Sequence, residues 1–106
     1  MNKKQVRANF RNAVFKRDNY SCVVCGKSAT QDTAEELLDA HHITNRNEIA
    51  NGGYVVENGI SLCKGIDGTS CHEKAEAQQE GFSPEELYKL VGSTKEKAEA
   101  ASRKLG

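Results

Sequence analysis

Apolar side chains at helical spacing mark the first element of the chain. Residues 4–16 are predicted to form an amphipathic helix because hydrophobic positions recur every three or four residues. These positions are Val6, Phe10, Ala13 and Val14. The next stretch, RDNYSCVVCGKS, loses this period and contains Asn, Ser and Gly, so it is predicted to be a turn.

The middle of the chain gives a mixed pattern. By propensity TAEELLDA (33–40) is predicted to be helical, with Thr33 and Glu36 resembling a capping box. NRNEIANGGYVVENG (45–59) is rich in Asn and Gly and predicts a long loop, with a sharp turn at the glycine pair Gly52-Gly53. GISLC (59–63) is short, apolar and partly β-branched, which favours a strand.

A third helix-forming signal follows the strand. Ser70 and Glu73 form an S-x-x-E capping box, which predicts a helix at about residues 71–80. Gly81 followed by Phe82 is typical of a glycine C-cap with its apolar contact. This helix therefore carries Cys71, His72 and Glu76 on its first two turns.

Two more helices are predicted near the C-terminus. Ser83 is followed by Pro84, a residue favoured at the first helical position. A second start signal runs from Ser93 to Glu96 and opens an alanine-rich segment. With no internal repeat and no low-complexity linker, residues 1–106 are predicted to form one domain.

The composition predicts a small hydrophobic core. Of the 106 residues 37% are hydrophobic, there is no Trp, and the mean hydropathy is -0.69. Domains of this size gain from a covalent or metal crosslink. Four cysteines offer either two disulfides or one four-thiolate metal site.

The cellular location of the protein bears on the choice between disulfides and a metal site. The basic N-terminal stretch has no apolar run of signal-peptide length, and no segment approaches the roughly 20 apolar residues of a membrane span. We therefore expect a cytoplasmic protein that is neither secreted nor membrane-bound. A reducing compartment favours a metal over disulfides, and zinc is the expected ion.

The charge is balanced overall but unevenly distributed. Residues 1–17 hold six basic and no acidic side chains, whereas the rest hold nine basic and fifteen acidic ones, so the two parts carry +6 and −6. Lys3, Arg7 and Arg11 form a stripe along the predicted helix. Such an arm can track a polyanion, although a solvated helix face explains it as well.

The cysteine spacing favours a zinc site. Cys22 and Cys25 are separated by two residues, a spacing that lets both thiolates reach one ion from a tight turn. Cys63 and Cys71 supply a second pair, although seven residues lie between them instead of the usual two to four. The alternatives are reduced core cysteines and a redox C-x-x-C motif.

Histidines accompany the cysteines. His41 and His42 are adjacent, and the third histidine, His72, directly follows Cys71. Glu76 lies four residues after His72, on the same helical face. If a zinc site fixes the start of this helix, it presents an imidazole and a carboxylate together, and the histidine pair is the remaining partner for them.

These motifs together resemble the HNH endonuclease family. The matching stretches are CVVC, LLDAHHI, NGGYVVENGISLC and CHEKAE, over about residues 11–76, and the arrangement is similar to small stand-alone HNH proteins of phages and mobile elements. The resemblance implies an α+β fold: a zinc-stapled ββα-metal domain with a basic N-terminal helix and a helical C-terminal extension over 77–106. It places LLDAHHI on a strand, against its helix propensity.

The resemblance also implies roles for individual residues. His41 and His72 correspond to ligands of a catalytic divalent ion and His42 to the general base. Asn58 corresponds to the asparagine that holds the long loop and orients that base. Some members carry a histidine where this chain has Glu76, which is either a third ligand or a solvated residue. Neighbouring strand residues point to opposite faces, so both histidines can serve one site only if the backbone bends there.

The implied function is metal-dependent hydrolysis of DNA phosphodiester bonds. The ions expected are structural Zn²⁺ and a catalytic Mg²⁺, Mn²⁺, Ni²⁺ or Zn²⁺. Double-stranded DNA is the expected partner, with phage packaging or recombination proteins beside it in the cytoplasm of a bacterial or phage-infected cell. The residues expected to contact DNA are Lys3, Arg7, Arg11 and Arg46. The alternative is a non-catalytic, zinc-stabilised module that binds nucleic acid.

Overall fold

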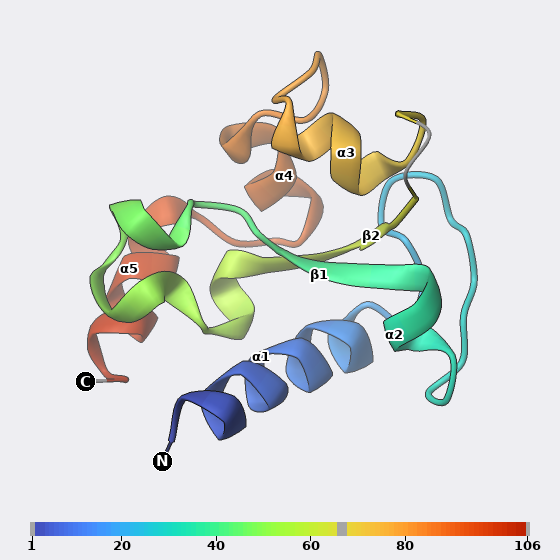
Figure 1. The fold of residues 1–106 in the computed structure, drawn as a ribbon. Helices are drawn as coiled ribbons and strands as arrows, with labels where there is room; N and C mark the ends of the chain where they lie inside the picture. Colours follow the sequence, from blue (N-terminus) through green and yellow to red (C-terminus); the bar gives the residue numbers. More distant parts are fainter. Residues whose placement is uncertain (1, 66–67, 106) are drawn as a thin grey trace.

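A two-stranded antiparallel hairpin runs through the middle of the protein (Figure 1). The computed structural model describes residues 2–65 and 68–105. Strand β1 (Leu38–His42) pairs with β2 (Gly59–Cys63), and the register runs unbroken from Leu38 opposite Cys63 to His42 opposite Gly59. The strand predicted for GISLC is confirmed.

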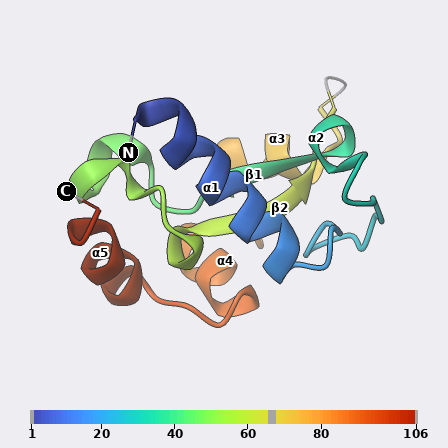
Figure 2. The same ribbon diagram turned by 90° about the horizontal axis from the view of Figure 1, so that it is seen from below.

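Helices cover both faces of this hairpin. Helix α1 (Lys3–Arg17) lies on one face and α3 (Cys71–Glu76) on the other, an arrangement seen from two directions in Figures 1 and 2. The structure thus confirms the predicted α+β class, with a small sheet between helices. None of the helices within the described residues is both long and apolar enough to span a membrane.

Helix α1 matches the predicted segment, but its buried stripe differs in part. Phe10, Val14 and Phe15 are buried, whereas Ala13 is exposed and Val6 is only half-buried. Phe15 removes more apolar area from water than Ala13 would, so the helix docks with that side inward. Ala13, one of the hydrophobic positions of the predicted pattern, therefore lies outside the buried face of the helix.

A glycine lets α1 approach the sheet closely. A Cβ atom on Gly59 would lie 2.3 Å from Val14 Cγ2 and 2.9 Å from Phe10 Cε1. The helix is also tied to the strand at its C-terminal end, where the Asp18 carboxylate accepts the Ser61 N–H at 2.8 Å. Helix α1 therefore rests directly on the backbone of β2.

The segment TAEELLDA contains both predicted states in succession. Helix α2 (Ala34–Leu37) is a single turn, and β1 follows it at once. The capping box predicted for Thr33 is absent, because Thr33 has helical φ and ψ and its hydroxyl accepts the Thr30 N–H at 2.9 Å instead. Local propensity thus decides only the first half of the segment, and strand pairing decides the second.

The predicted long loop, residues 45–59, contains three short turn segments, of which the middle one is kinked at Asn51 and Gly52. They are η1 (Arg46–Glu48), η2 (Ala50–Gly53) and η3 (Val56–Asn58). The sharp turn predicted at the glycine pair is confirmed by φ values of 79° at Gly52 and 68° at Gly53. A Cβ on Gly53 would also lie 2.5 Å from Asn58 Nδ2, so this loop closes around a glycine.

Helix α3 starts as predicted and ends early. The capping box of Ser70 and Glu73 is present in full. The helix stops at Glu76 because Gln78 adopts φ 49°, and the Gln78 and Gln79 N–H groups bond back to the Ala75 and Lys74 carbonyls. This is a Schellman motif without glycine, so the C-cap predicted at Gly81 is wrong. The segment before the helix includes residues 66 and 67, which lie outside the described residues.

Two further helices form the C-terminal extension. Helix α4 (Pro84–Leu90) begins at the Ser83 cap as predicted. Helix α5 (Lys95–Arg103) is capped by Thr94, whose hydroxyl accepts the Lys97 N–H at 3.1 Å. Ser93, the predicted cap, donates instead to the Glu57 carbonyl at 2.8 Å, so its hydroxyl is held by the loop.

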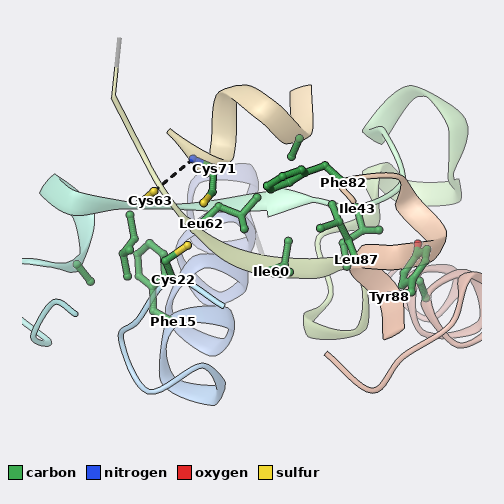
Figure 3. Packing of buried hydrophobic residues seen from close by; sticks show 14 of the residues in the cluster. Phe15, Cys22, Ile43, Ile60, Leu62, Cys63, Cys71, Phe82, Leu87 and Tyr88 are labelled. Atoms are coloured by element: carbon green, nitrogen blue, oxygen red, sulfur yellow. Dashed lines mark hydrogen bonds between the residues drawn. The ribbon is translucent and has the colours of Figure 1, made fainter. Parts of the chain in front are cut away.

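The hydrophobic core lies between the hairpin and the helices. All of β2 is buried, and Ile60 and Leu62 are fully so. Figure 3 shows Phe82 and Leu87 beside Ile43 and Ile60 at one end, with cysteines at the other. The C-terminal extension therefore shares its core with the hairpin.

Candidate active site and metal centres

Four cysteine side chains meet at one end of the sheet. Cys22 and Cys25 come from the turn after α1, Cys63 ends β2, and Cys71 begins α3. The four sulfurs lie within 4.8 Å of one another, and Cys25 Sγ is 3.6 Å from Cys63 Sγ. Tetrahedral zinc with Zn–S bonds of about 2.3 Å places its sulfurs about 3.8 Å apart. All four sulfurs can therefore bind one zinc ion.

The backbone around these sulfurs suits thiolate ligands. Cys25 N–H donates to Cys22 Sγ at 3.5 Å, and Cys71 N–H donates to Cys63 Sγ at 3.3 Å (Figure 3). Burial raises the pKa of Cys22, but backbone hydrogen bonds outweigh it and lower that pKa to about 7. All four cysteines are free thiols, so the two-disulfide alternative is absent from this cluster.

A second group of potential ligands joins β1 to α3. The ligand atoms of His41, His72 and Glu76 lie within 4.8 Å of one another. His72 Nε2 is 3.0 Å and His41 Nδ1 is 3.8 Å from Glu76 Oε1, and the two imidazole rings are 5.2 Å apart. Two nitrogens and one carboxylate oxygen suit several divalent transition metals, Mn²⁺ among them. The sequence thus predicted a set of residues that the fold brings together.

Asp39 supports this group, although the sequence analysis did not include it among the site residues. Its Oδ2 lies 2.7 Å from His72 Nδ1, on the side of the ring away from Glu76. A neutral imidazole that donates from Nδ1 keeps its lone pair on Nε2, where it can bind a metal. Residues two apart in a strand point to the same face, so a strand through His41 places Asp39 on the face of His41.

The surroundings of the three-ligand group shift the pKa values of its two histidines in opposite directions. Burial, followed by the charge of His72, lowers the pKa of His41 to about 4. The hydrogen bond with Asp39 raises the pKa of His72, and the same bond lowers the pKa of Asp39. His41 is therefore a neutral imidazole at neutral pH, the form that binds a metal ion.

His42 points to the other face of the hairpin. Its ring stacks on Phe10 of α1 with centroids 4.5 Å apart, and it meets the ring of Tyr54 edge-on at 4.6 Å. The strand register passes through both histidines without a bulge, so alternation separates their side chains. The backbone bend that the sequence analysis required is absent from β1.

The His42 side chain is partly buried between aromatic rings and lies near a positive charge. Burial, followed by the charge of Arg46, lowers the pKa of His42 to about 4. Its Nε2 is buried and has no hydrogen-bond partner among the described residues. A buried nitrogen without a partner costs about 1–3 kcal/mol, a cost that proteins commonly accept at functional sites.

One surface cleft nevertheless reaches both histidines. It lies between β1, the loop that begins at Asn45, and the start of the C-terminal extension. Its lining includes Asp39, His41, His42, Arg46, His72 and Glu76. The three-ligand group therefore opens to solvent, and a ligand in the cleft can contact His42 and Arg46 as well.

Asn58 holds the long loop. It is fully buried, and its amide bonds to the backbone of Thr44 through Oδ1 at 2.9 Å and Nδ2 at 3.1 Å. Nδ2 also donates to the Gly53 carbonyl at 3.2 Å. These contacts fix the backbone at Thr44, two residues after His42. The asparagine predicted to hold the loop thus forms hydrogen bonds with it.

The C-terminal extension reinforces this loop through two residues that the sequence analysis missed. The Tyr88 hydroxyl donates to Asn58 Oδ1 at 2.7 Å and lies 2.6 Å from Thr44 Oγ1. Ser102 of α5 accepts the Gly53 N–H at 3.1 Å and donates to the Ala50 carbonyl. Both contacts join segments far apart in the chain, so no local pattern signals them.

The four predicted DNA-contacting residues lie in two different settings. Arg11 Nη1 is 3.0 Å from the Glu35 carboxylate. Arg7 lies over the ring of Tyr54, 6.0 Å from its centroid, and Arg46 Nη1 is 3.4 Å from the Tyr54 hydroxyl. Lys3 lines the same surface depression as Arg7 and Arg46. The structure brings these three together and places Arg11 in an ion pair.

Comparisons of the chain with protein-family models, with curated proteins and with solved structures found no match. The chemistry of the site is therefore argued from its own residues. A cluster of two imidazoles and a carboxylate can hold a divalent ion beside an anionic ligand. A neutral imidazole and an arginine on the same cleft can serve an acid–base step on a phosphate ester.

Proposed function

We propose that this protein is a metal-dependent endonuclease of the HNH type, which hydrolyses phosphodiester bonds in double-stranded DNA. The observation that carries the proposal is the three-ligand group of His41, His72 and Glu76 at the wall of a cleft that also exposes His42 and Arg46. The motif order noted in the sequence supports the same reading. A four-thiolate zinc site beside the cleft supplies the rigidity that so small a core needs.

The residues around the cleft have different roles in the proposed reaction. His41, His72 and Glu76 would hold one divalent ion, which supplies charge stabilisation at the scissile phosphate and at the departing 3′ oxygen. Asp39 fixes the ring orientation of His72 through its 2.7 Å contact. Arg46 lies on the cleft, where its guanidinium can bind a phosphate oxygen.

His42 is assigned the proton transfer. The oxygen of a water molecule forms a bond to phosphorus, its proton passes to His42, and the bond from phosphorus to the 3′ oxygen breaks. The leaving oxygen takes a proton from solvent and becomes a 3′ hydroxyl. Because His42 Nε2 is buried, Nδ1 is the nitrogen that we assign as the proton acceptor.

One observation favours a second candidate, a non-catalytic zinc-stabilised module that binds nucleic acid. The His42 ring stacks on Phe10 and meets Tyr54 edge-on, contacts that would also suit a purely structural histidine. The basic and aromatic residues near it would bind nucleic acid in either case. Cleavage is the property that separates the two candidates.

The experiment is incubation of supercoiled plasmid with the zinc-loaded protein and Mg²⁺, Mn²⁺, Ni²⁺, Zn²⁺ or EDTA. We expect nicked or linear DNA with at least one ion, no product in EDTA, and a strong loss of cleavage in His72→Ala. Lys89→Ala, a change at an exposed position of α4, serves as the matched control. A folded, zinc-containing protein that binds plasmid and cleaves it with none of these ions would contradict the nuclease proposal and support the binding module.

A further inference from the structure

Tyr54 contacts both His42 and two of the basic residues, Arg7 and Arg46. It follows η2, and its half-buried ring meets His42 edge-on at 4.6 Å and Phe10 edge-on at 5.7 Å. Arg7 lies 6.0 Å from the centroid of the same ring, and Arg46 Nη1 lies 3.4 Å from its hydroxyl. One side chain therefore connects a candidate base with two arginines.

The arginines beside Tyr54 keep their charge available. Tyr54 is a neutral partner, which attracts Arg7 through its ring face and accepts a hydrogen bond from Arg46 without cancelling either charge. Arg11, on the same helix as Arg7, instead pairs with Glu35 at 3.0 Å. The basic stripe of α1 therefore has one end neutralised and one end free to bind an anion.

The free end lines a surface depression. Its polar lining consists of Lys3, Arg7, Arg46, Asn47, Asn51 and Tyr54, and no acidic residue is among the described residues that line it. Arg46 also lines the cleft with His41 and His42, so the depression and the cleft share a wall. Three cations and two amides suit a phosphodiester backbone better than a neutral ligand.

We propose that this depression binds the DNA backbone beside the cleaved phosphate, and that Tyr54 is a positioning residue that holds both the arginines and the His42 ring in place. The proposal rests on the nuclease function argued above. The hydroxyl of Tyr54 contacts Arg46 and its ring face contacts Arg7, so both parts of the side chain serve DNA binding. The ring also packs against His42 and thus serves the chemical step, because contacts with Phe10 and Tyr54 restrict the orientation of the imidazole.

Binding is tested first, without cleavage. Fluorescence anisotropy of a labelled duplex in EDTA, over a series of salt concentrations, gives the Kd and its salt dependence. Arg7→Ala and Arg46→Ala should each weaken binding about tenfold at low salt and lower the slope of log K against log salt by about 0.9. Arg11→Ala should have a smaller effect than Arg7→Ala, and Lys89→Ala should match the wild type.

Tyr54 is then tested by measuring DNA binding and the single-turnover cleavage rate separately. Tyr54→Phe should weaken DNA binding about threefold and keep the single-turnover rate at saturating DNA, because the ring remains. Tyr54→Leu should lower that rate about tenfold with the divalent ion still bound, because the imidazole loses its support. Thermal denaturation of both variants shows whether the fold is retained. If Tyr54 had only a structural role, its variants would lose stability, and Tyr54→Phe and Tyr54→Leu would have the same single-turnover rate.

The outcomes separate this proposal from the nuclease proposal. Cleavage that depends on His42 but is unchanged by Tyr54→Leu, with binding unchanged by Arg7→Ala and Arg46→Ala, would overturn the present inference and leave the nuclease intact. Binding that depends on both arginines in a protein that never cleaves would support the backbone site and contradict the nuclease. No binding of the duplex at low salt would overturn the site proposed here.

Discussion

The two groups of candidate metal ligands share helix α3, which supplies one ligand to the first and two to the second, and they differ in their other ligands and in their exposure. The cysteine cluster takes its ligands from the turn after α1, the end of β2 and the start of α3, and three of its four residues are buried. The cluster of His41, His72 and Glu76 takes its ligands from β1 and α3 alone. It lines an open cleft, and the Glu76 side chain is 66% exposed.

That difference indicates different roles for the two clusters. Four soft sulfur donors that converge from three segments fill a tetrahedral ion completely and tie the segments together. Three donors on a cleft leave positions open, as a reacting ligand requires. Since Cys71 and His72 are adjacent, the first cluster also fixes the root of the helix that carries the second.

Loss of the cysteine cluster should have the largest effect. Cys25→Ser should release the zinc and unfold the protein, because structural zinc contributes roughly 10–16 kcal/mol, comparable to the whole stability of a small domain. Metal analysis and circular dichroism measure both effects. A native protein with two disulfides and no zinc would contradict the role assigned to this cluster.

The loop beside the open cluster should depend on hydrogen bonds rather than on an ion. Asn58→Ala leaves the Thr44 N–H, the Gly53 carbonyl and the Tyr88 hydroxyl short of a buried partner, so we expect a loss of about 3 kcal/mol with zinc still bound. Chemical denaturation gives the free energy of unfolding. Asn12→Ala, at an exposed position of α1, should change it by less than about 0.5 kcal/mol. Equal effects from the two variants would remove Asn58 from its proposed role.

Changes in the open cluster should weaken ion binding and spare the fold. His72→Ala should weaken binding of Mn²⁺ to zinc-loaded protein about 100-fold, and Asp39→Asn about tenfold, because outer partners orient the ligand. Calorimetric titration measures both values, with Asp32→Asn, on an exposed turn, as the matched control for Asp39. Unaltered Mn²⁺ affinity in His72→Ala would place the ion elsewhere.

The smallest effect is expected for Glu76. Its side chain is 66% exposed, so Glu76→Gln should weaken Mn²⁺ binding by about tenfold or less. Glu80→Gln, in the exposed turn after α3, is the control in the same titration. An effect as large as that of His72→Ala would make Glu76 a full ligand, whereas no effect would make it a solvated neighbour.

The fold was predictable where its signals are local. The capping box at Ser70, the Pro84 start and the Gly52-Gly53 turn all depend on a few neighbouring residues, and each was predicted. The errors at Thr33 and Gly81 arise from local alternatives, a hydrogen bond from Thr30 and a Schellman motif at Gln78. The exposure of Ala13 depends instead on how α1 packs against the sheet. The strand of His41 was found only through the family resemblance, since its propensity favours a helix.

The candidate site was predictable in its motif residues and not in its supports. His41, His72 and Glu76 follow from spacing and order in the sequence. Asp39, Tyr54 and Tyr88 act through contacts across the fold, and their residue types are unremarkable in their local stretches. The position of the His42 ring between Phe10 and Tyr54 likewise depends on how α1 docks.

The central claim, that adjacent histidines divide metal binding from proton transfer, is tested by single-turnover cleavage as a function of divalent-ion concentration. His42→Ala should keep its ion affinity and lose about 10²–10⁴-fold in rate, with a residual rate that rises with pH as hydroxide replaces the base. His41→Ala should need more ion and regain part of its rate when ion is in excess. Full cleavage by both variants, or rescue of His42→Ala by excess ion, would contradict the account.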